Sequence, residues 1–134
     1  MTTFAYPVTI RNLLTGAEVR VDALADTGST FSMLPASLLA GLDVRPVRSV
    51  RAEIADGSLI ELPIGYAEVE VDGEAVPTLC AFGAEGIQPV LGALAMEALL
   101  IAPDPVHRRF LKVSALLYRA RSNDDSLGTE GLAP

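Results

Sequence analysis

The segment over residues 24–30 places one carboxylate and two hydroxyls directly after an apolar stretch. Asp26 follows two apolar residues, and Thr27, Gly28 and Ser29 come next. A carboxylate held between apolar walls and hydroxyl groups is suited to general acid or base chemistry on a water molecule. Asp and Gly are also common turn residues, so the plain alternative is that Asp26 only caps the segment that follows it.

The rest of the composition argues against several other classes of site. His107 is the only histidine, which disfavours a histidine-based triad and a zinc site built from histidines. The single cysteine, Cys80, forms no internal disulfide, and we expect it to be an inert, buried strand residue. The net charge of −7 disfavours contact with phosphate backbones. We therefore expect no metal, no other cofactor and no nucleic-acid partner.

The elements that position Asp26 are predicted to be strands. Residues 17–24 alternate apolar and polar side chains, which is the period of a half-buried strand, and they lead straight into Asp26. Residues 8–12 predict the preceding strand, with a turn at residues 14–16 between the two. Residues 32–42 predict a short helix or helical turn that begins near Pro35.

Two hairpins are predicted in the middle of the chain. Strand-like runs within residues 47–63 flank Asp56-Gly57, a dipeptide suited to a tight turn with positive φ angles. A second hairpin pairs residues 66–71 with residues 76–82 around Asp72-Gly73. These signals indicate a domain built mainly of antiparallel hairpins.

The last part of the domain combines a short strand, a helix and a further strand pair. Residues 90–91 predict a short apolar strand that ends at Gly92, and residues 93–99 are rich in helix formers. Residues 100–102 and 109–117 predict strands around a turn at residues 103–105. The sum is an all-β fold with one short C-terminal helix, and the absence of βαβ alternation disfavours a nucleotide-binding sheet.

We expect one domain over residues 1–119, followed by a polar, disordered tail over residues 120–134. No apolar run is long enough to cross a membrane, and the N-terminus lacks the pattern of a secretory signal. A cytoplasmic protein without a membrane partner is the corresponding expectation.

Taken in order, these motifs resemble the retropepsin-like, single-domain aspartic proteases, and in particular their cellular and bacterial members. Residues 24–29 are similar to the active-site loop of that family, which reads apolar-apolar-Asp-Thr/Ser-Gly-Ala/Ser. The second family signature, two apolar residues, a Gly and a short helix, is matched by residues 90–99. Asp56-Gly57 stands where the family carries the tip of its flap hairpin. The resemblance runs in order from Val8 to Val113.

The resemblance implies an acid-protease half-fold, a closed or partly open β-barrel, with endopeptidase activity on extended peptides. Asp26 would act on the catalytic water, and Thr27 would cross-link two such loops through its hydroxyl. Gly28 would present its carbonyl to substrate, and Ser29 would hydrogen-bond the outer oxygen of Asp26. The expected substrate-binding residues are apolar strand residues and the flap tip: Leu24, Ile54, Ala55, Asp56, Gly57, Ser58, Leu59, Val90 and Leu91. Apolar pocket walls predict a preference for hydrophobic side chains.

Carboxylate-based peptide hydrolysis needs two carboxylates, one ionised as the base and one protonated as the acid. The chain has a single Asp-Thr-Gly sequence, whereas five other aspartates fall in predicted surface strands or turns: Asp22, Asp43, Asp56, Asp72 and Asp104. A catalytic pair therefore requires a second copy, and a two-fold homodimer that places Asp26 against its mate is the simplest arrangement. Residues 4–8 and 112–117 are candidates for strands that interleave across such a dimer.

Two alternatives remain open. The family helix usually begins with a polar residue shortly after the Gly, whereas Ala93, Leu94 and Ala95 follow Gly92 here. This departure favours, as a second interpretation, a catalytically weak or silent dimer that acts as a peptide-binding or scaffolding module. The other alternative is a self-processing protease with one physiological target.

Overall fold

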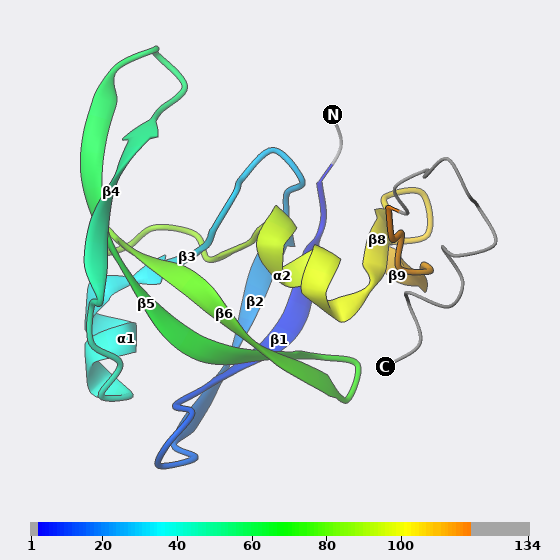
Figure 1. The fold of residues 1–134 in the computed structure, drawn as a ribbon, viewed down its shortest axis with the longest axis horizontal. Coiled ribbons are helices and arrows are strands. Elements are labelled where there is room, and N and C mark those ends of the chain that lie inside the picture. The colour runs from blue at the N-terminus through cyan, green and yellow to red at the C-terminus, as the bar shows by residue number, and fades with distance from the viewer. Residues whose placement is uncertain (1–2, 119–134) are drawn as a thin grey trace, which may run out of the picture.

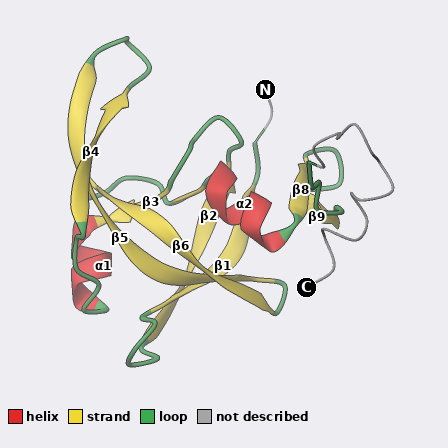
Figure 2. Ribbon diagram, in the orientation of Figure 1, coloured by secondary structure: helices red, strands yellow, loops and turns green. Residues whose placement is uncertain are grey.

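The computed structural model describes residues 3–118 and shows a β-sheet that curls into a partly closed barrel (Figure 1). Strands dominate, and two short helices lie against the sheet (Figure 2). In chain order the described elements are β1 (Ala5–Arg11), β2 (Glu18–Ala25), β3 (Ser32–Pro35), α1 (Ala36–Gly41), β4 (Arg48–Glu53), β5 (Leu59–Val71), β6 (Glu74–Gly83), β7 (Val90–Leu91), α2 (Ala93–Leu99), β8 (Ile101–Asp104) and β9 (Arg109–Lys112).

The main sheet has the strand order β1-β2-β7-β3-β6-β5-β4. Strand β7 is parallel to β2 and antiparallel to β3, so it lies between the strands that enter and leave the Asp26 loop. Strand β1 also pairs with β5, which closes one side of the barrel. Strand β4 stands at the other end of the strand order, and the barrel is therefore only partly closed.

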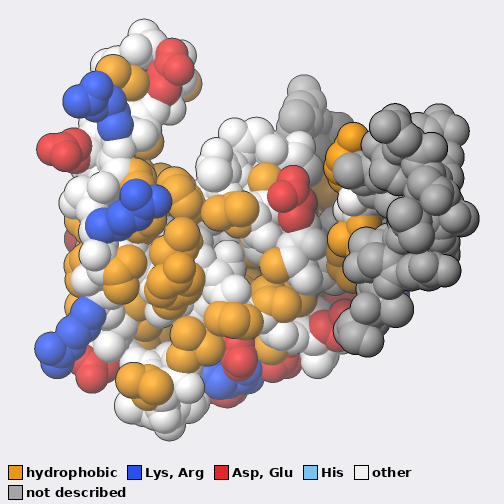
Figure 3. Space-filling view, viewed as in Figure 1, with side chains coloured by type: hydrophobic (Ala, Val, Ile, Leu, Met, Phe, Trp, Pro, Cys, Tyr) orange, Lys and Arg blue, Asp and Glu red, His pale blue; other side chains and the backbone are white. Residues whose placement is uncertain are grey.

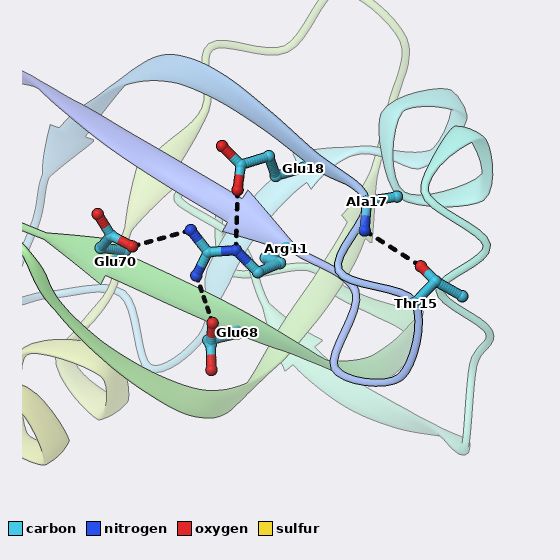
Figure 4. A network of polar contacts seen from close by, with 6 residues as sticks. All are labelled: Arg11, Thr15, Ala17, Glu18, Glu68 and Glu70. Carbon is cyan, nitrogen blue, oxygen red and sulfur yellow. Dashed lines mark hydrogen bonds and ion pairs between the residues drawn. The ribbon is translucent and has the colours of Figure 1, made fainter.

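Arg11 holds the closed side together, because its guanidinium contacts carboxylates on two neighbouring strands (Figure 4). Its Nε donates to Glu18 on β2 at 2.9 Å, and its Nη2 donates to Glu70 on β5 at 2.8 Å. Its Nη1 also pairs with Glu68. Hydrogen bonds to Glu70, Glu68 and Glu18 raise the pKa of Arg11 above its ordinary value, so the cation is permanent.

The hydrophobic core lies inside the curl of the sheet. Strand β5 shows how the alternation works, since Ala67, Val69 and Val71 are buried while Glu68 and Glu70 stay at the surface side. Helix α1 supplies Leu39, and the other core positions come mostly from β1, β6, β7 and α2: Val8, Ile10, Cys80, Leu91, Ala95, Met96 and Leu99.

Cys80 is fully buried, as predicted, and burial raises the pKa of its thiol to about 12. At neutral pH this sulfur is therefore an inert thiol.

Both predicted hairpins are confirmed, but their turns differ. Asp72 and Gly73 both have positive φ angles, 53° and 84°, which makes a two-residue turn between β5 and β6. At the tip of the β4–β5 hairpin only Gly57 has a positive φ, at 86°. The Ile54 amide donates to Ser58 O at 2.9 Å, so this tip is a wider, three-residue loop.

The prediction of helix over the whole of residues 32–42 was wrong at its start. Ser32 to Pro35 form strand β3, which runs parallel to β6, and helix begins only at Ala36. Ser32 and Leu34 are buried in the sheet, so tertiary pairing overrides the local helix signal. The short C-terminal helix, in contrast, occupies residues 93–99 as predicted.

For the last strand pair, the predicted position of the turn and the predicted end of the second strand were wrong. Strand β8 continues through Pro103 and Asp104, and the turn comes at residues 105–108. The carboxylate of Asp104 accepts the amides of Val106 at 3.1 Å and His107 at 3.3 Å, which fixes the turn after it. Strand β9 ends at Lys112, so residues 113–117 do not continue it.

The two segments predicted to interleave across a dimer differ in their pairing within the chain, since the first is in the main sheet and the second is not. Residues 5–8 of the first candidate already pair with β2, and Phe4 packs its buried ring against Tyr6 and Phe110. Residues 113–118 carry exposed apolar side chains, among them Leu116 and Leu117. The predicted tail over residues 120–134 lies outside the described residues. No helix within residues 3–118 is long and apolar enough to cross a membrane.

Candidate active site

Asp26 stands at the point where β2 leaves the sheet. The amide of Leu24 donates to Pro89 O at 2.8 Å, and the amide of Asp26 donates to Leu91 O at 3.0 Å. On the other side, the amide of Ala25 donates to Phe4 O at 2.9 Å. The backbone before Asp26 is therefore held from both sides, and the carboxylate extends from a rigid strand rather than from a free loop.

The loop after Asp26 folds back onto the carboxylate. The amide of Gly28 donates to Asp26 Oδ1 at 2.8 Å, and the amide of Ser29 donates to Asp26 O at 3.2 Å. A Cβ on Gly28 would lie 3.2 Å from Asp26 Oδ1, which is a tight contact. Asp26 is half-buried, whereas Thr27 and Gly28 are exposed.

Ser29 makes a different contact from the one that the resemblance implies. Its hydroxyl donates to Phe31 O at 2.7 Å. A hydroxyl has only one hydrogen to donate, so in this structure that hydrogen does not go to the outer oxygen of Asp26. The physical reason is local, because the carbonyl two residues further along the turn is within reach of the side chain.

The second predicted motif packs directly against this loop. The amide of Ala93 donates to Ser29 O at 2.7 Å, and the amide of Leu94 donates to Thr30 O at 3.1 Å. Gly92 fits so closely that an added Cβ would lie 2.4 Å from Phe31 O. The two segments that stand far apart in the sequence therefore form one structural unit.

A groove of about 670 Å³ lies between the Asp26 loop and the β4–β5 hairpin. Its lining includes five of the predicted site residues: Asp26, Gly28, Ser29, Ile54 and Ala55. The hairpin projects away from the rest of the molecule (Figure 1), and Figure 3 shows an open hollow on its inner side. An extended chain could enter this groove and lie across the carboxylate.

The hairpin borders the groove with both apolar and charged side chains. Val50 lies opposite Leu62, and Ala52 lies opposite Ile60, so these four side chains share one face. Ala52 and Leu62 line the groove. Arg51 lies on the opposite face of β4, between Val50 and Ala52, and is exposed. It nevertheless also lines the groove.

The other predicted binding residues do not line this groove. Leu24 and Val90 lie side by side on β2 and β7, and Leu91 is a core residue with 1% exposure. The hairpin tip and the start of β5 are exposed instead: Asp56, Gly57, Ser58 and Leu59. The Asp56 carboxylate accepts from the Ser58 hydroxyl at 2.6 Å and from its amide at 2.8 Å, which lowers the pKa of Asp56.

Sequence reasoning missed several walls of the groove. Phe31 and Met33 enter from the loop and from β3, and Leu62 and Ala81 come from β5 and β6. Burial alternates along Ser32, Met33 and Leu34 in the folded sheet, but the sequence Ser-Met-Leu-Pro has no matching alternation of polar and apolar residues. No sequence signal therefore identifies Met33 as a groove wall.

The solution structure of the simian foamy virus (mac) protease is similar to this chain. It superposes with a TM-score of 0.53 and 19% identity, over 75% of this chain and 99% of that protein. The chain has the retropepsin fold. The predicted all-β half-fold with a short C-terminal helix is thereby confirmed.

A second retropepsin-fold structure, the EIAV protease complexed with the inhibitor HBY-793, matches at 20% identity with a TM-score of 0.48. That match covers 72% of this chain and 88% of the other. No family model matches the sequence, and no curated protein matches it.

Proposed function

We propose that the chain is one subunit of a homodimeric aspartic endopeptidase, similar to the cellular and bacterial retropepsin-like enzymes. The observation that carries the proposal is the position of Asp26, a half-buried carboxylate on a rigid strand end, in a groove bordered by the β4–β5 hairpin. A groove of this size accommodates several residues of an extended peptide. The carboxylate supplies the acid or base function that amide hydrolysis requires.

The second carboxylate comes from a second copy of the chain. The groove lining contains one other acidic residue, Glu53 on β4, and Glu53 is exposed. It does not offer the buried, symmetric partner that a dyad needs. A two-fold axis beside the Asp26 loop would bring two Asp26 carboxylates together.

In such a pair the two carboxylates share one proton, because two close carboxylates do not ionise together without a large cost. The ionised Asp26 takes a proton from the attacking water. The protonated Asp26 of the other subunit donates its proton to the scissile carbonyl oxygen. The first Asp26 then passes the proton that it took from water to the departing amine, and the other Asp26 takes back a hydroxyl proton as the tetrahedral intermediate collapses, so the pair again shares one proton. The exposed Thr27 and Gly28 form the turn near the start of the loop, where Thr27 would contact the other loop and Gly28 O would accept from substrate.

The substrate class follows from the groove walls. Met33, Ile54, Leu62 and Ala81 are apolar, which favours peptides with hydrophobic side chains next to the scissile bond. The hairpin would act as a flap that closes over the bound peptide and excludes water. An extended peptide offers its backbone as an added strand, which supplies affinity without sequence preference.

The test is mass-spectrometric mapping of cleavage in a peptide library, with wild type and Asp26→Asn compared at several pH values between about pH 4 and pH 7, because activity that depends on a carboxylate pair changes with pH. We expect cuts beside hydrophobic residues that are present only with wild type. Cleavage of the same peptides by Asp26→Asn would refute the role of Asp26.

A peptide-binding module is the second candidate, and the observation that favours it is the apolar start of α2, Ala93, Leu94 and Ala95. It predicts that wild type and Asp26→Asn retain the same peptides without cutting them. The protease predicts that only Asp26→Asn retains intact substrates, since wild type releases products.

A further inference from the structure

Ser32 lies in the junction between the Asp26 loop and α2. It is 2% exposed, and its Oγ accepts a hydrogen bond from the amide of Gly92 at 3.0 Å. Ser32 begins β3 and Gly92 precedes α2, so this bond joins the end of the loop to the start of the helix. The sequence pattern predicts a helix at Ser32 and indicates no function for it.

The hydrogen bond between Ser32 and Gly92 lies next to the one that holds the backbone of Asp26. Leu91, the neighbour of Gly92, accepts the amide of Asp26 at 3.0 Å. Any displacement of Gly92 therefore moves the carbonyl that holds Asp26. Two further hydrogen bonds cross the same junction, from the amides of Ala93 and Leu94 to the carbonyls of Ser29 and Thr30, and both join backbone groups.

The side chains at the start of α2 add no polar contact to this junction. Ala93, Leu94 and Ala95 have neither donors nor acceptors beyond the backbone. The hydroxyl of Ser32, on the β3 side of the junction, accepts the hydrogen bond of the buried Gly92 amide instead. A buried amide without such an acceptor is unfavourable, and the segment would shift to find one.

We propose that Ser32 is a positioning residue for Asp26, acting through Gly92 and Leu91. This inference rests on the proposed protease function. Removal of the hydroxyl frees the amide of Gly92 and lets the α2 start move against the loop. The two Asp26 carboxylates of the dimer then lose their alignment with the scissile bond, which slows the chemical step more than it weakens peptide binding.

The variants for the test are Ser32→Ala, which removes the hydroxyl without added volume, and Ser32→Thr, which keeps it. Thr78→Val serves as the matched control, because Thr78 is also a buried hydroxyl residue, at 6% exposure, and lies on β6 outside the groove. Activity is measured well below the unfolding temperature of each variant, so that loss of folded protein does not contribute.

We expect Ser32→Ala to lower kcat by about 10- to 100-fold with KM changed less than about twofold, as displaced catalytic groups do. Ser32→Thr should recover most of the loss, and Thr78→Val should keep the wild-type kcat. A kcat for Ser32→Ala equal to that of Thr78→Val would overturn the proposal.

A second readout needs no activity. Hydrogen exchange of the Gly92, Ala93 and Leu94 amides should be at least about tenfold faster in Ser32→Ala than in Thr78→Val, because local opening exposes these donors. Unchanged exchange would overturn the positioning role even if cleavage is found. If wild type cleaves nothing but exchange accelerates as expected, the proposed function fails while the coupling of Ser32 to the loop stands.

Discussion

The amide of Asp26 and the carbonyl oxygen of Leu91 form a hydrogen bond of 3.0 Å that joins the two motifs on which the site depends. Leu91 is buried in the core, and Asp26 begins the loop beside the groove. Core packing therefore sets the position of the carboxylate. We therefore expect substitutions at Val90, Leu91 and Gly92 to affect the site, although none of these residues lines the groove.

Gly92→Ala should destabilise the protein strongly. The added Cβ would lie 2.4 Å from Phe31 O and 2.8 Å from Ser29 O, so backbone must move. Overpacking of this kind costs about 1–3 kcal/mol of unfolding free energy, or more where backbone is the obstacle. Urea denaturation measures the loss.

Gly41→Ala is the control for that substitution. Gly41 ends α1, and an added Cβ there meets nothing within 4 Å. We expect a change between neutral and a stabilisation of about 1 kcal/mol. Equal urea midpoints for the two variants would contradict the tight contact at Gly92.

Ile54→Asp should impair cleavage of hydrophobic peptides. Ile54 lines the groove at the base of the hairpin tip, and a carboxylate there would oppose apolar side chains of substrate. A lost apolar contact of this size lowers kcat/KM by about tenfold or more. Steady-state kinetics with one hydrophobic peptide give the comparison.

Leu59→Asp is the matched control, because Leu59 is exposed on the same hairpin but does not line the groove. Its kcat/KM should stay near the wild-type value. A loss equal to that of Ile54→Asp would restore the sequence-based expectation that Leu59 is a pocket wall.

The β8–β9 turn should contribute pH-dependent stability through Asp104. The His107 side chain at 2.9 Å, the amide of His107 and Arg109 lower the pKa of Asp104 in the folded state. A group with a depressed folded pKa stabilises the fold above its unfolded pKa, and the contribution is lost as pH falls through the folded pKa.

Asp104→Asn removes the charge and keeps an oxygen that can accept the turn amides. Its unfolding midpoint should therefore lie below that of wild type at neutral pH, and the two should converge below the ordinary aspartate range, about pH 4. A difference that stays constant from neutral to acid pH would exclude this ionic contribution.

Much of the fold could be predicted from local patterns. The alternation in β2 and the Asp-Gly turns of both hairpins are encoded within a few residues, and so is the helix after Gly92. Strand β3 could not be identified in this way, because Ser32 to Pro35 become strand only through pairing with Cys80 to Gly83 on β6. That pairing depends on the packed sheet and leaves no local signal.

The candidate site, like the fold, could be predicted only in part. The position of Asp26 beside a hairpin was implied by the resemblance to retropepsin-like proteases, whereas the groove walls Met33 and Ala81 depend on which side of β3 and β6 faces the hairpin. The hydroxyl of Ser29 shows the limit most clearly, since its choice of Phe31 O as acceptor is a matter of loop geometry.

The most direct test of a shared dyad is a subunit-mixing titration. Wild type and Asp26→Asn are exchanged in varying ratios at constant total concentration, and cleavage of one peptide is measured. If each active site needs Asp26 from both subunits, activity follows the square of the wild-type fraction and an equal mixture retains about a quarter of full activity, because random pairing makes only that share of dimers fully wild type. With subunit exchange complete, an equal mixture that retains about three quarters of full activity would show that one Asp26 per dimer suffices, and about one half would show that each subunit acts with its own Asp26 alone. Either result would contradict the account.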